Sequence, residues 1–156
     1  MIVYKKGDLL KSDCNVLVHQ CNCKGVMGSG IAKQIRDTYP LVYEEFKKDY
    51  DRGNAKLGNI LSVEVPLSDG TTRLIINIYA QDEYEPRTIR HTDYGAFAAC
   101  LFKIKDGFRY MNKREIKIGF PDHIGCGLAG GDWKIVERLI EDVFAEPEWN
   151  VEIWKL

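Results

Sequence analysis

The sequence predicts an α/β protein in which helices cover both faces of a mixed, mostly parallel sheet, making three layers. Three observations lead to this prediction. Short apolar runs typical of strands alternate with apolar residues at helical spacing, which is the pattern of parallel βαβ units. One pair of runs is joined only by a short segment containing Ser68-Asp69-Gly70, which indicates a hairpin. Two glycine-rich turns each follow a strand and precede a helix.

Four strands and two helical pieces are expected in the first half of the chain. The runs that predict the strands occupy residues 2–4, 15–20, 59–65 and 72–79. Residues 16–18 are apolar without alternation, which indicates a strand covered on both faces. After this strand Ile31, Ile35 and Val42 recur at helical spacing, and Pro40 should break or kink the helix. A second helical piece is therefore expected over residues 41–51.

The second half of the chain predicts two helices and two strands. Thr92 is expected to cap the N-terminus of a helix that ends near Gly107. Ile116, Ile118 and Phe120 alternate as in a strand. Residues 132–144 predict a strongly amphipathic helix, and residues 151–154 the last strand. No linker, repeat or low-complexity stretch divides the chain, so residues 1–156 are expected to form one domain.

Composition and charge exclude several classes of protein. The hydrophobic share is 45% and the formal net charge is −1, so neither disorder nor a strongly basic nucleic-acid-binding surface is expected. No apolar run approaches the length that spans a membrane. The five cysteines are odd in number and no signal peptide is evident, which favours reduced thiols. We expect a monomer in the cytoplasm, or also in the nucleus if the source is eukaryotic.

The two glycine-rich turns, at residues 19–32 and 121–133, carry the strongest functional signal. Such a turn points several backbone N–H groups at one anion, and the following helix adds its positive N-terminal dipole. Two such turns in one small domain indicate a ligand with more than one charged or hydroxyl-rich group, such as a nucleotide diphosphate.

Neither turn fits the common nucleotide-binding motifs. In the first turn Ile31-Ala32 stands where a Walker A loop needs Lys and Ser or Thr, which argues against a magnesium-dependent triphosphatase. The second turn matches the dinucleotide pattern through its glycines, but the chain ends at Leu156, before a complete βαβ unit with its ribose-binding acid. Cys21 and Cys23 have no second ligand pair at zinc-like spacing, so no metal or other cofactor is expected.

Five segments together resemble a macro domain: Gly7-Asp8-Leu9, Val18–Cys23, Met27–Ala32, Ile124–Leu128 and Asp132-Trp133. The resemblance covers nearly the whole chain and implies a macro-domain-like fold. It is greatest to the branch that holds ADP-ribose 1''-phosphate phosphatases and terminal ADP-ribose protein glycohydrolases. The family binds ADP-ribose in a cleft over the sheet, so ADP-ribose or a derivative is the implied partner, and an ADP-ribosylated macromolecule is a second possibility.

The resemblance also implies roles for individual residues. Asp8, followed by Leu9, would accept a hydrogen bond from the adenine amino group, and Asn22 would bond a hydroxyl of the distal ribose. One turn would hold the diphosphate through Gly28, Ser29, Gly30 and Ile31. The other would hold the diphosphate and the distal ribose through Ile124, Gly125, Cys126, Gly127 and Leu128.

Three residues are candidates for catalysis, and each has a structural alternative. His19 would act as general acid and base, or would be a core histidine bonded to a backbone carbonyl. Asn22 would place the ribose, or would tie down the loop backbone. Asp132 would orient a water molecule, or would cap the following helix. The polar loop with Gln81, Asp82, Arg87, Arg90 and His91 could rim the cleft, although solvation is the preferred interpretation for most of these side chains.

Two departures from related glycohydrolases decide the expected activity. Residues 78–82 contain no lysine where those enzymes use one, and Ala129 stands where some use an aspartate. Both argue against a covalent lysine–ribose mechanism. The leading expectation is hydrolysis of ADP-ribose 1''-phosphate to ADP-ribose and phosphate. The alternatives are removal of ADP-ribose from protein or nucleic acid, and a non-catalytic reader of ADP-ribose.

Overall fold

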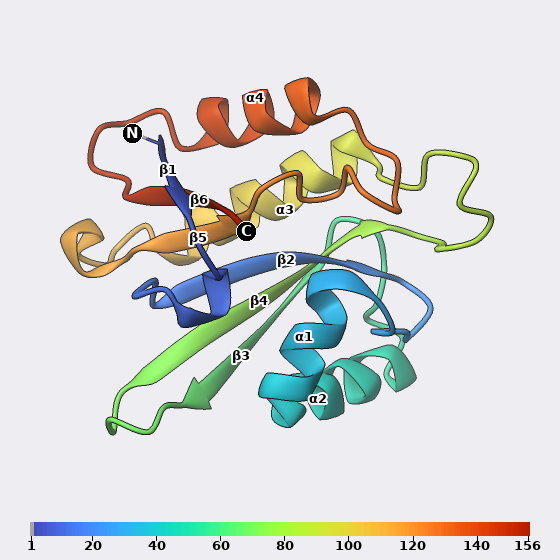
Figure 1. The fold of residues 1–156 in the computed structure, drawn as a ribbon, viewed down its shortest axis with the longest axis horizontal. Coiled ribbons are helices and arrows are strands. Elements are labelled where there is room, and N and C mark those ends of the chain that lie inside the picture. Colours follow the sequence, from blue (N-terminus) through green and yellow to red (C-terminus); the bar gives the residue numbers. More distant parts are fainter. Residues whose placement is uncertain (1) are drawn as a thin grey trace.

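The computed structural model describes residues 2–156 and shows a six-stranded sheet between two pairs of helices (Figure 1). The strand order is β1-β6-β5-β2-β4-β3; all neighbours are parallel except β3 and β4, which form the predicted hairpin. The strands are β1 (Ile2–Lys6), β2 (Val16–Asn22), β3 (Ile60–Pro66), β4 (Thr72–Gln81), β5 (Ile118–Pro121) and β6 (Val151–Lys155). The predicted fold class is confirmed.

Helices cover both faces of this sheet. They are α1 (Gly30–Thr38), α2 (Pro40–Asp51), α3 (Tyr94–Gly107) and α4 (Trp133–Val143), with short 3-10 helices η1 (Leu9–Lys11) and η2 (Lys113–Glu115). In Figure 1 α3 and α4 lie above the sheet and α1 and α2 below it. Each pair buries its own apolar layer against the sheet. No helix within residues 2–156 is long and apolar enough to cross a membrane.

The predicted helix break at Pro40 is confirmed, and two predicted element boundaries are corrected. Pro40 begins α2 directly after α1, as a residue without an N–H can do at a helix start. Asp93, not Thr92, caps α3, because its side chain accepts a hydrogen bond from Ala96 N. Thr92 is instead buried and donates to the carbonyl of Gly125. Ile116 lies outside β5, at the end of η2.

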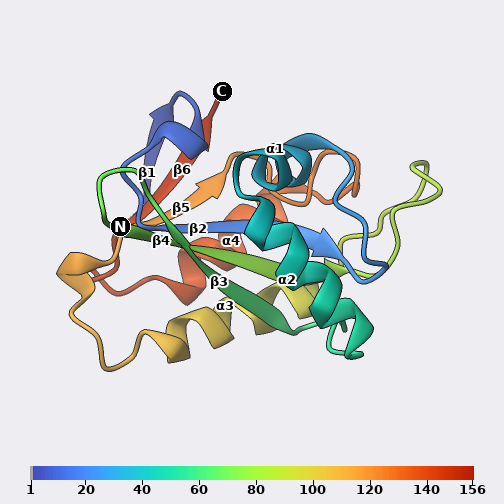
Figure 2. The same ribbon diagram turned by 90° about the horizontal axis from the view of Figure 1, so that it is seen from below.

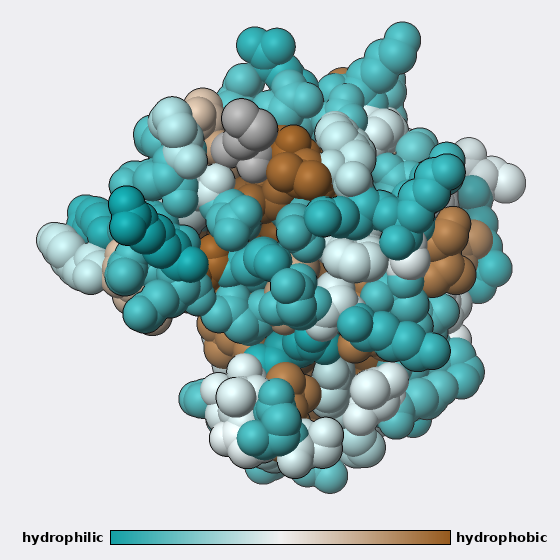
Figure 3. Space-filling model, turned by 60° about the vertical axis from the view of Figure 1, so that its left-hand side comes forward, coloured by the Kyte–Doolittle hydropathy of each residue, from teal (hydrophilic) through white to brown (hydrophobic). Residues whose placement is uncertain are grey.

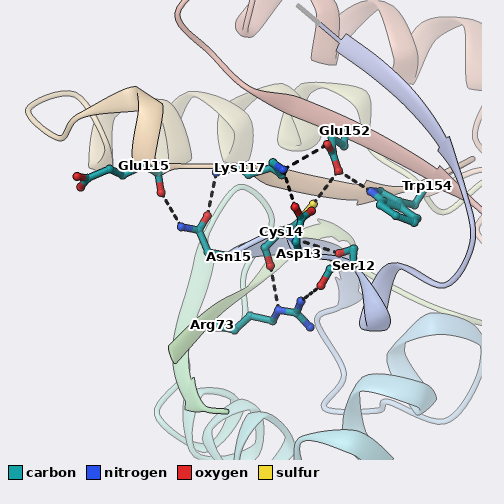
Figure 4. Close-up of polar contacts among 9 residues, drawn as sticks. All are labelled: Ser12, Asp13, Cys14, Asn15, Arg73, Glu115, Lys117, Glu152 and Trp154. Atoms are coloured by element: carbon teal, nitrogen blue, oxygen red, sulfur yellow. Dashed lines mark hydrogen bonds and ion pairs between the residues drawn. The ribbon is translucent and has the colours of Figure 1, made fainter. Parts of the chain in front are cut away.

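A dense polar network ties the amino ends of the central strands together (Figure 4). The guanidinium of Arg73, 5% exposed, donates to the carbonyls of Cys14 and Leu10 at 2.9 Å each and also to the carbonyl of Ser12. Its remaining contact is the hydroxyl of Tyr39, at 3.0 Å. One buried cation therefore satisfies three loop carbonyls at this end of the sheet.

Glu152 is the second centre of this network. It accepts hydrogen bonds from the Trp154 indole at 2.9 Å and from the Cys14 thiol at 3.3 Å. Lys117 lies 2.8 Å from Asp13 and 3.8 Å from Glu152, and it holds the pKa of the Asp13 carboxyl below its usual value. Burial raises the pKa of the Cys14 thiol to about 11. Asp13, Cys14 and Glu152 have the spacing of metal ligands, but Lys117 already forms ion pairs with both carboxylates.

The face of the molecule drawn in Figure 3 is largely hydrophilic. Figure 3 shows one face of the molecule, on which hydrophobic side chains are scattered among hydrophilic ones. Single exposed apolar side chains are normal on soluble proteins.

Candidate functional site

A cleft of about 440 Å³ lies at the carboxyl ends of β2, β4 and β5. The loops that follow these strands gather on one side of the molecule, at the right in Figures 1 and 2. Ligands bind at this edge in open α/β sheets. The cleft is lined by residues 20–22, 26, 28–32, 81, 84, 85, 87, 121–125 and 127–129.

The first glycine turn leaves a row of backbone N–H groups unpaired. Helix α1 starts at Gly30 without a side-chain cap from Ser29. Within residues 2–156, the amide N–H groups of Gly28, Ser29, Gly30, Ile31 and Ala32 have no acceptor. All five residues line the cleft. Together with the positive end of the helix dipole, they form a site for an anion.

Asn22 holds this first turn in place. Its side-chain oxygen accepts hydrogen bonds from Lys24 N at 3.0 Å and Val26 N at 3.3 Å, and its side-chain nitrogen donates to Val26 O at 2.9 Å. Asn22 also lines the cleft. The loop-fixing alternative is therefore observed, and the contact with a ribose stays a prediction.

The second glycine turn lines the other side of the cleft. The amide N–H groups of Gly125, Gly127, Leu128 and Ala129 have no acceptor among the described residues. The Gly125 carbonyl is fixed by the Thr92 hydroxyl at 2.6 Å and by Gly131 N at 2.9 Å. Gly125 has a φ of +74°, and a Cβ there would lie 2.7 Å from the Gln20 side-chain oxygen. Glycine is therefore required at position 125.

Gln20 links both sides of the cleft, although the sequence did not single it out. Its side-chain nitrogen donates to Gln81 at 2.8 Å and to the Thr92 hydroxyl at 2.9 Å. Its side-chain oxygen is buried and has no partner among residues 2–156. Because Gln20 contacts residues more than sixty positions away, only the strand register could have revealed this role.

His123 is a second site residue whose geometry the sequence did not reveal. Its ring Nδ1 lies 2.8 Å from a carboxylate oxygen of Asp122, and the ring stacks on Trp133 with centroids 5.0 Å apart. Among residues 2–156, His123 is the only residue other than glycine with a positive φ, at 59°. Residues other than glycine adopt this conformation rarely, and mostly where surrounding contacts enforce it. His123 and Asp122 both line the cleft.

The placement of His19 does not support the expected acid–base role. The side chain is fully buried in β2, and Nε2 lies 2.6 Å from the side-chain oxygen of Asn77 on β4. Burial lowers the pKa of His19 to about 4. His19 does not line the cleft. It is a core histidine, bonded to a side-chain amide where the structural alternative expected a backbone carbonyl.

Four other expected site residues also lie outside the cleft lining. Asp8 caps η1 by accepting from Leu10 N at 2.9 Å, and Leu9 is buried in the core. Asp132 is exposed and caps α4 through Lys134 N, so it has the structural role weighed for it. The Cys126 thiol donates to Ile124 O, and burial raises its pKa to about 11.

The remaining expected site residues line one cleft. They are Asn22, Gly28, Ser29, Gly30, Ile31, Ile124, Gly125, Gly127 and Leu128. From the polar loop, Gln81 and Arg87 line it too, whereas Asp82, Arg90 and His91 do not.

The family model for the Macro domain matches residues 18–140, which include both turns, β5 and most of β2. The chain belongs to the macro domain family. This macro domain is 31% identical over 147 residues to the DNA ADP-ribosyl glycohydrolase of Mycobacterium tuberculosis, covering 94% of the chain and 39% of that protein. The chain therefore corresponds to well under half the length of that relative.

Two further likenesses bear on the macro domain's function. The chain is 49% identical over 176 residues to the ADP-ribose 1''-phosphate phosphatase of Scheffersomyces stipitis, covering 98% of the chain and 99% of that protein. Its structure matches the macrodomain of Mycobacterium tuberculosis DarG with a TM-score of 0.85 and 31% identity, covering 99% and 97% of the two chains.

Proposed function

We propose that this macro domain binds ADP-ribose through its two glycine turns. The observation that carries the proposal is the two sets of unpaired amide N–H groups on either side of one cleft. A diphosphate between them would satisfy both sets, because each N–H is a ready donor to a phosphate oxygen. The distal ribose then lies near Asn22 and Gln81, which are register partners on β2 and β4.

The reaction we propose is hydrolysis of ADP-ribose 1''-phosphate. Water attacks the phosphorus, the bond from phosphorus to the ribose oxygen breaks, and that oxygen takes up a proton. The phosphatase relative that the chain matches along nearly its whole length supports this choice. With His19 in the core and Asp132 outside the cleft lining, protons have to come from solvent or from the lining residues Glu85, Asp122 and His123.

Two measurements test the proposal together. Calorimetry should show one ADP-ribose bound per chain, and a phosphate-release assay should show turnover of ADP-ribose 1''-phosphate. Protein that binds ADP-ribose but releases no phosphate would contradict the proposed activity and leave the binding intact. Protein that does not bind ADP-ribose would contradict both.

Removal of ADP-ribose from DNA is the second candidate function. The match to the relative named DNA ADP-ribosyl glycohydrolase, from Mycobacterium tuberculosis, favours it. The absence of a lysine from residues 78–82 argues against a covalent lysine route. ADP-ribosylated DNA and protein, followed by gel electrophoresis, separate this function from the first. Binding without turnover of any of these substrates would instead indicate a reader of ADP-ribose.

A further inference from the structure

The loop that joins β4 to α3, residues 82–91, bridges the two glycine turns. At its start Cys23 N donates to Asp82 O at 3.1 Å, next to the first turn. At its end His91 N donates to Ala129 O at 2.8 Å, in the second turn. The loop projects from the carboxyl end of β4, at the right of Figures 1 and 2. We name residues 82–91 the bridging loop.

Ion pairs strengthen the first of these two attachments. The Lys24 amine lies 3.3 Å from a Glu83 carboxylate oxygen and 3.7 Å from one of Asp82. Lys24 therefore holds the start of the bridging loop. It does not line the cleft, so its charge serves these ion pairs and not a ligand in the cleft.

Arg87 is the one lysine or arginine among the residues that line the cleft. It extends from the bridging loop, and two carboxylates, Glu85 and Asp122, line the same cleft. The Arg87 side chain is 56% exposed, and its contact with Glu85 is long, at 4.0 Å. The Arg87 guanidinium is therefore available to an incoming anion. Without Arg87, the carboxylates of Glu85 and Asp122 would be the charged side chains of the lining, and they would repel an anion.

The position of the bridging loop indicates which anion Arg87 meets. The loop follows Gln81, whose register partner is Asn22. The proposed function places the distal ribose beside these two residues. The backbone N–H groups of the turns serve the diphosphate, so a phosphate on the far carbon of that ribose needs its own partner.

We propose that Arg87 binds the 1''-phosphate of ADP-ribose 1''-phosphate and so makes this chain selective for the phosphorylated ligand over ADP-ribose. A guanidinium offers two parallel N–H donors to two phosphate oxygens, which suits a terminal phosphate better than a point charge does. This inference rests on the proposed function, because that function places the distal ribose.

The test compares Arg87→Ala with Arg90→Ala. Arg90 lies in the same loop, but its guanidinium packs over the Tyr94 ring at 4.4 Å and it does not line the cleft. In phosphate-release kinetics Arg87→Ala should raise KM for ADP-ribose 1''-phosphate about tenfold, the usual scale for one charge-assisted contact. Arg87→Lys should recover part of this loss. Arg90→Ala should have wild-type kinetics.

Calorimetry with ADP-ribose is the second arm of the test. Arg87→Ala should bind ADP-ribose, which lacks the phosphate, as tightly as wild type does. An unchanged KM, or an equal loss of affinity for both ligands, would overturn the inference.

Failure of the proposed activity stays distinguishable from failure of this inference. If wild type releases no phosphate, both ligands can be compared directly by calorimetry. The inference then requires wild type to prefer ADP-ribose 1''-phosphate and Arg87→Ala to lose that preference. Equal preferences in the two proteins would contradict it.

Discussion

The two ends of the central strands treat their polar groups in opposite ways. At the amino ends, Arg73 donates to the carbonyls of Leu10, Ser12 and Cys14, and Lys117 pairs with the carboxylates of Asp13 and Glu152. At the carboxyl ends, nine backbone N–H groups in the two turns have no acceptor among residues 2–156: those of residues 28–32, 125 and 127–129. The side-chain oxygen of Gln20 is unpaired there as well.

This difference separates stability from binding. The unpaired N–H groups of the two turns lie mostly on exposed residues, where water satisfies them until a ligand takes its place. The amino-end network needs no ligand, because its own side chains supply the partners. Changes at that end should affect unfolding, and changes at the cleft should affect ligand affinity.

The largest expected effect comes from breaking the amino-end network with Arg73→Met. The carbonyls of Leu10, Ser12 and Cys14 would lose their buried partner. At roughly 1–3 kcal/mol for each unpaired group, partly relieved by water, we expect a loss of about 4 kcal/mol in the free energy of unfolding. Urea denaturation measures this loss. The fraction that stays folded should bind ADP-ribose with wild-type affinity, and a selective loss of binding would contradict the separation.

The pH dependence of stability tests whether His19 belongs to the core. Its pKa is lowered to about 4, so between pH 6.5 and pH 4 the unfolded chain takes up a proton that the folded chain does not. The free energy of unfolding should therefore fall by about 3 kcal/mol as the pH drops through this window. Urea denaturation across the window should show this fall in wild type and a smaller one in His19→Gln.

Turnover supplies the complementary readout for His19. If His19 serves only the core, His19→Gln should hydrolyse ADP-ribose 1''-phosphate at the wild-type rate at neutral pH. A large loss of kcat in a folded variant would restore His19 to the reaction.

Asp132 lies at the end of the second turn, but we expect a change there to affect stability and not ligand binding, as at the amino-end network. Its carboxylate caps α4, so Asp132→Ala should lower the free energy of unfolding by about 1 kcal/mol. Asp132→Asn, which keeps a capping oxygen, should restore stability. Thermal unfolding measures both. A loss of ADP-ribose 1''-phosphate hydrolysis in the stable Asn variant would show that the carboxylate has a chemical role.

The fold and both turns could be predicted because their signals are local. Apolar runs and glycine spacing report on neighbouring residues, and they located the sheet, the helices and most of the cleft lining. Thr92 and Asp93 show the limit of such signals. Both side chains can cap a helix, and the distant carbonyl of Gly125 decides that Thr92 does not.

Several side chains have roles in the structure that depend on contacts no local pattern reports. Asp8 and Asp132 are carboxylates that serve as caps, and the same residue type in the same motif would suit a ligand. Gln20 gains its role from side-chain hydrogen bonds to Gln81 and Thr92, which lie far away in the sequence. The strained backbone of His123 follows from the path of its turn.

Calorimetry of ADP-ribose binding to Gly127→Ala tests the central claim most directly. A Cβ at position 127 meets no protein atom within 4 Å, and the φ lies outside the left-handed region, so the fold should be unaffected. The methyl group would stand among the unpaired N–H groups of the second turn. Gly107→Ala, at the end of α3 and equally free of contacts, is the matched control.

We predict that Gly127→Ala unfolds at the wild-type temperature and binds ADP-ribose at least about tenfold more weakly, a loss of about 1.4 kcal/mol. Gly107→Ala should bind as wild type does. Wild-type affinity in Gly127→Ala would contradict the claim that the unpaired N–H groups of the two turns hold the ligand.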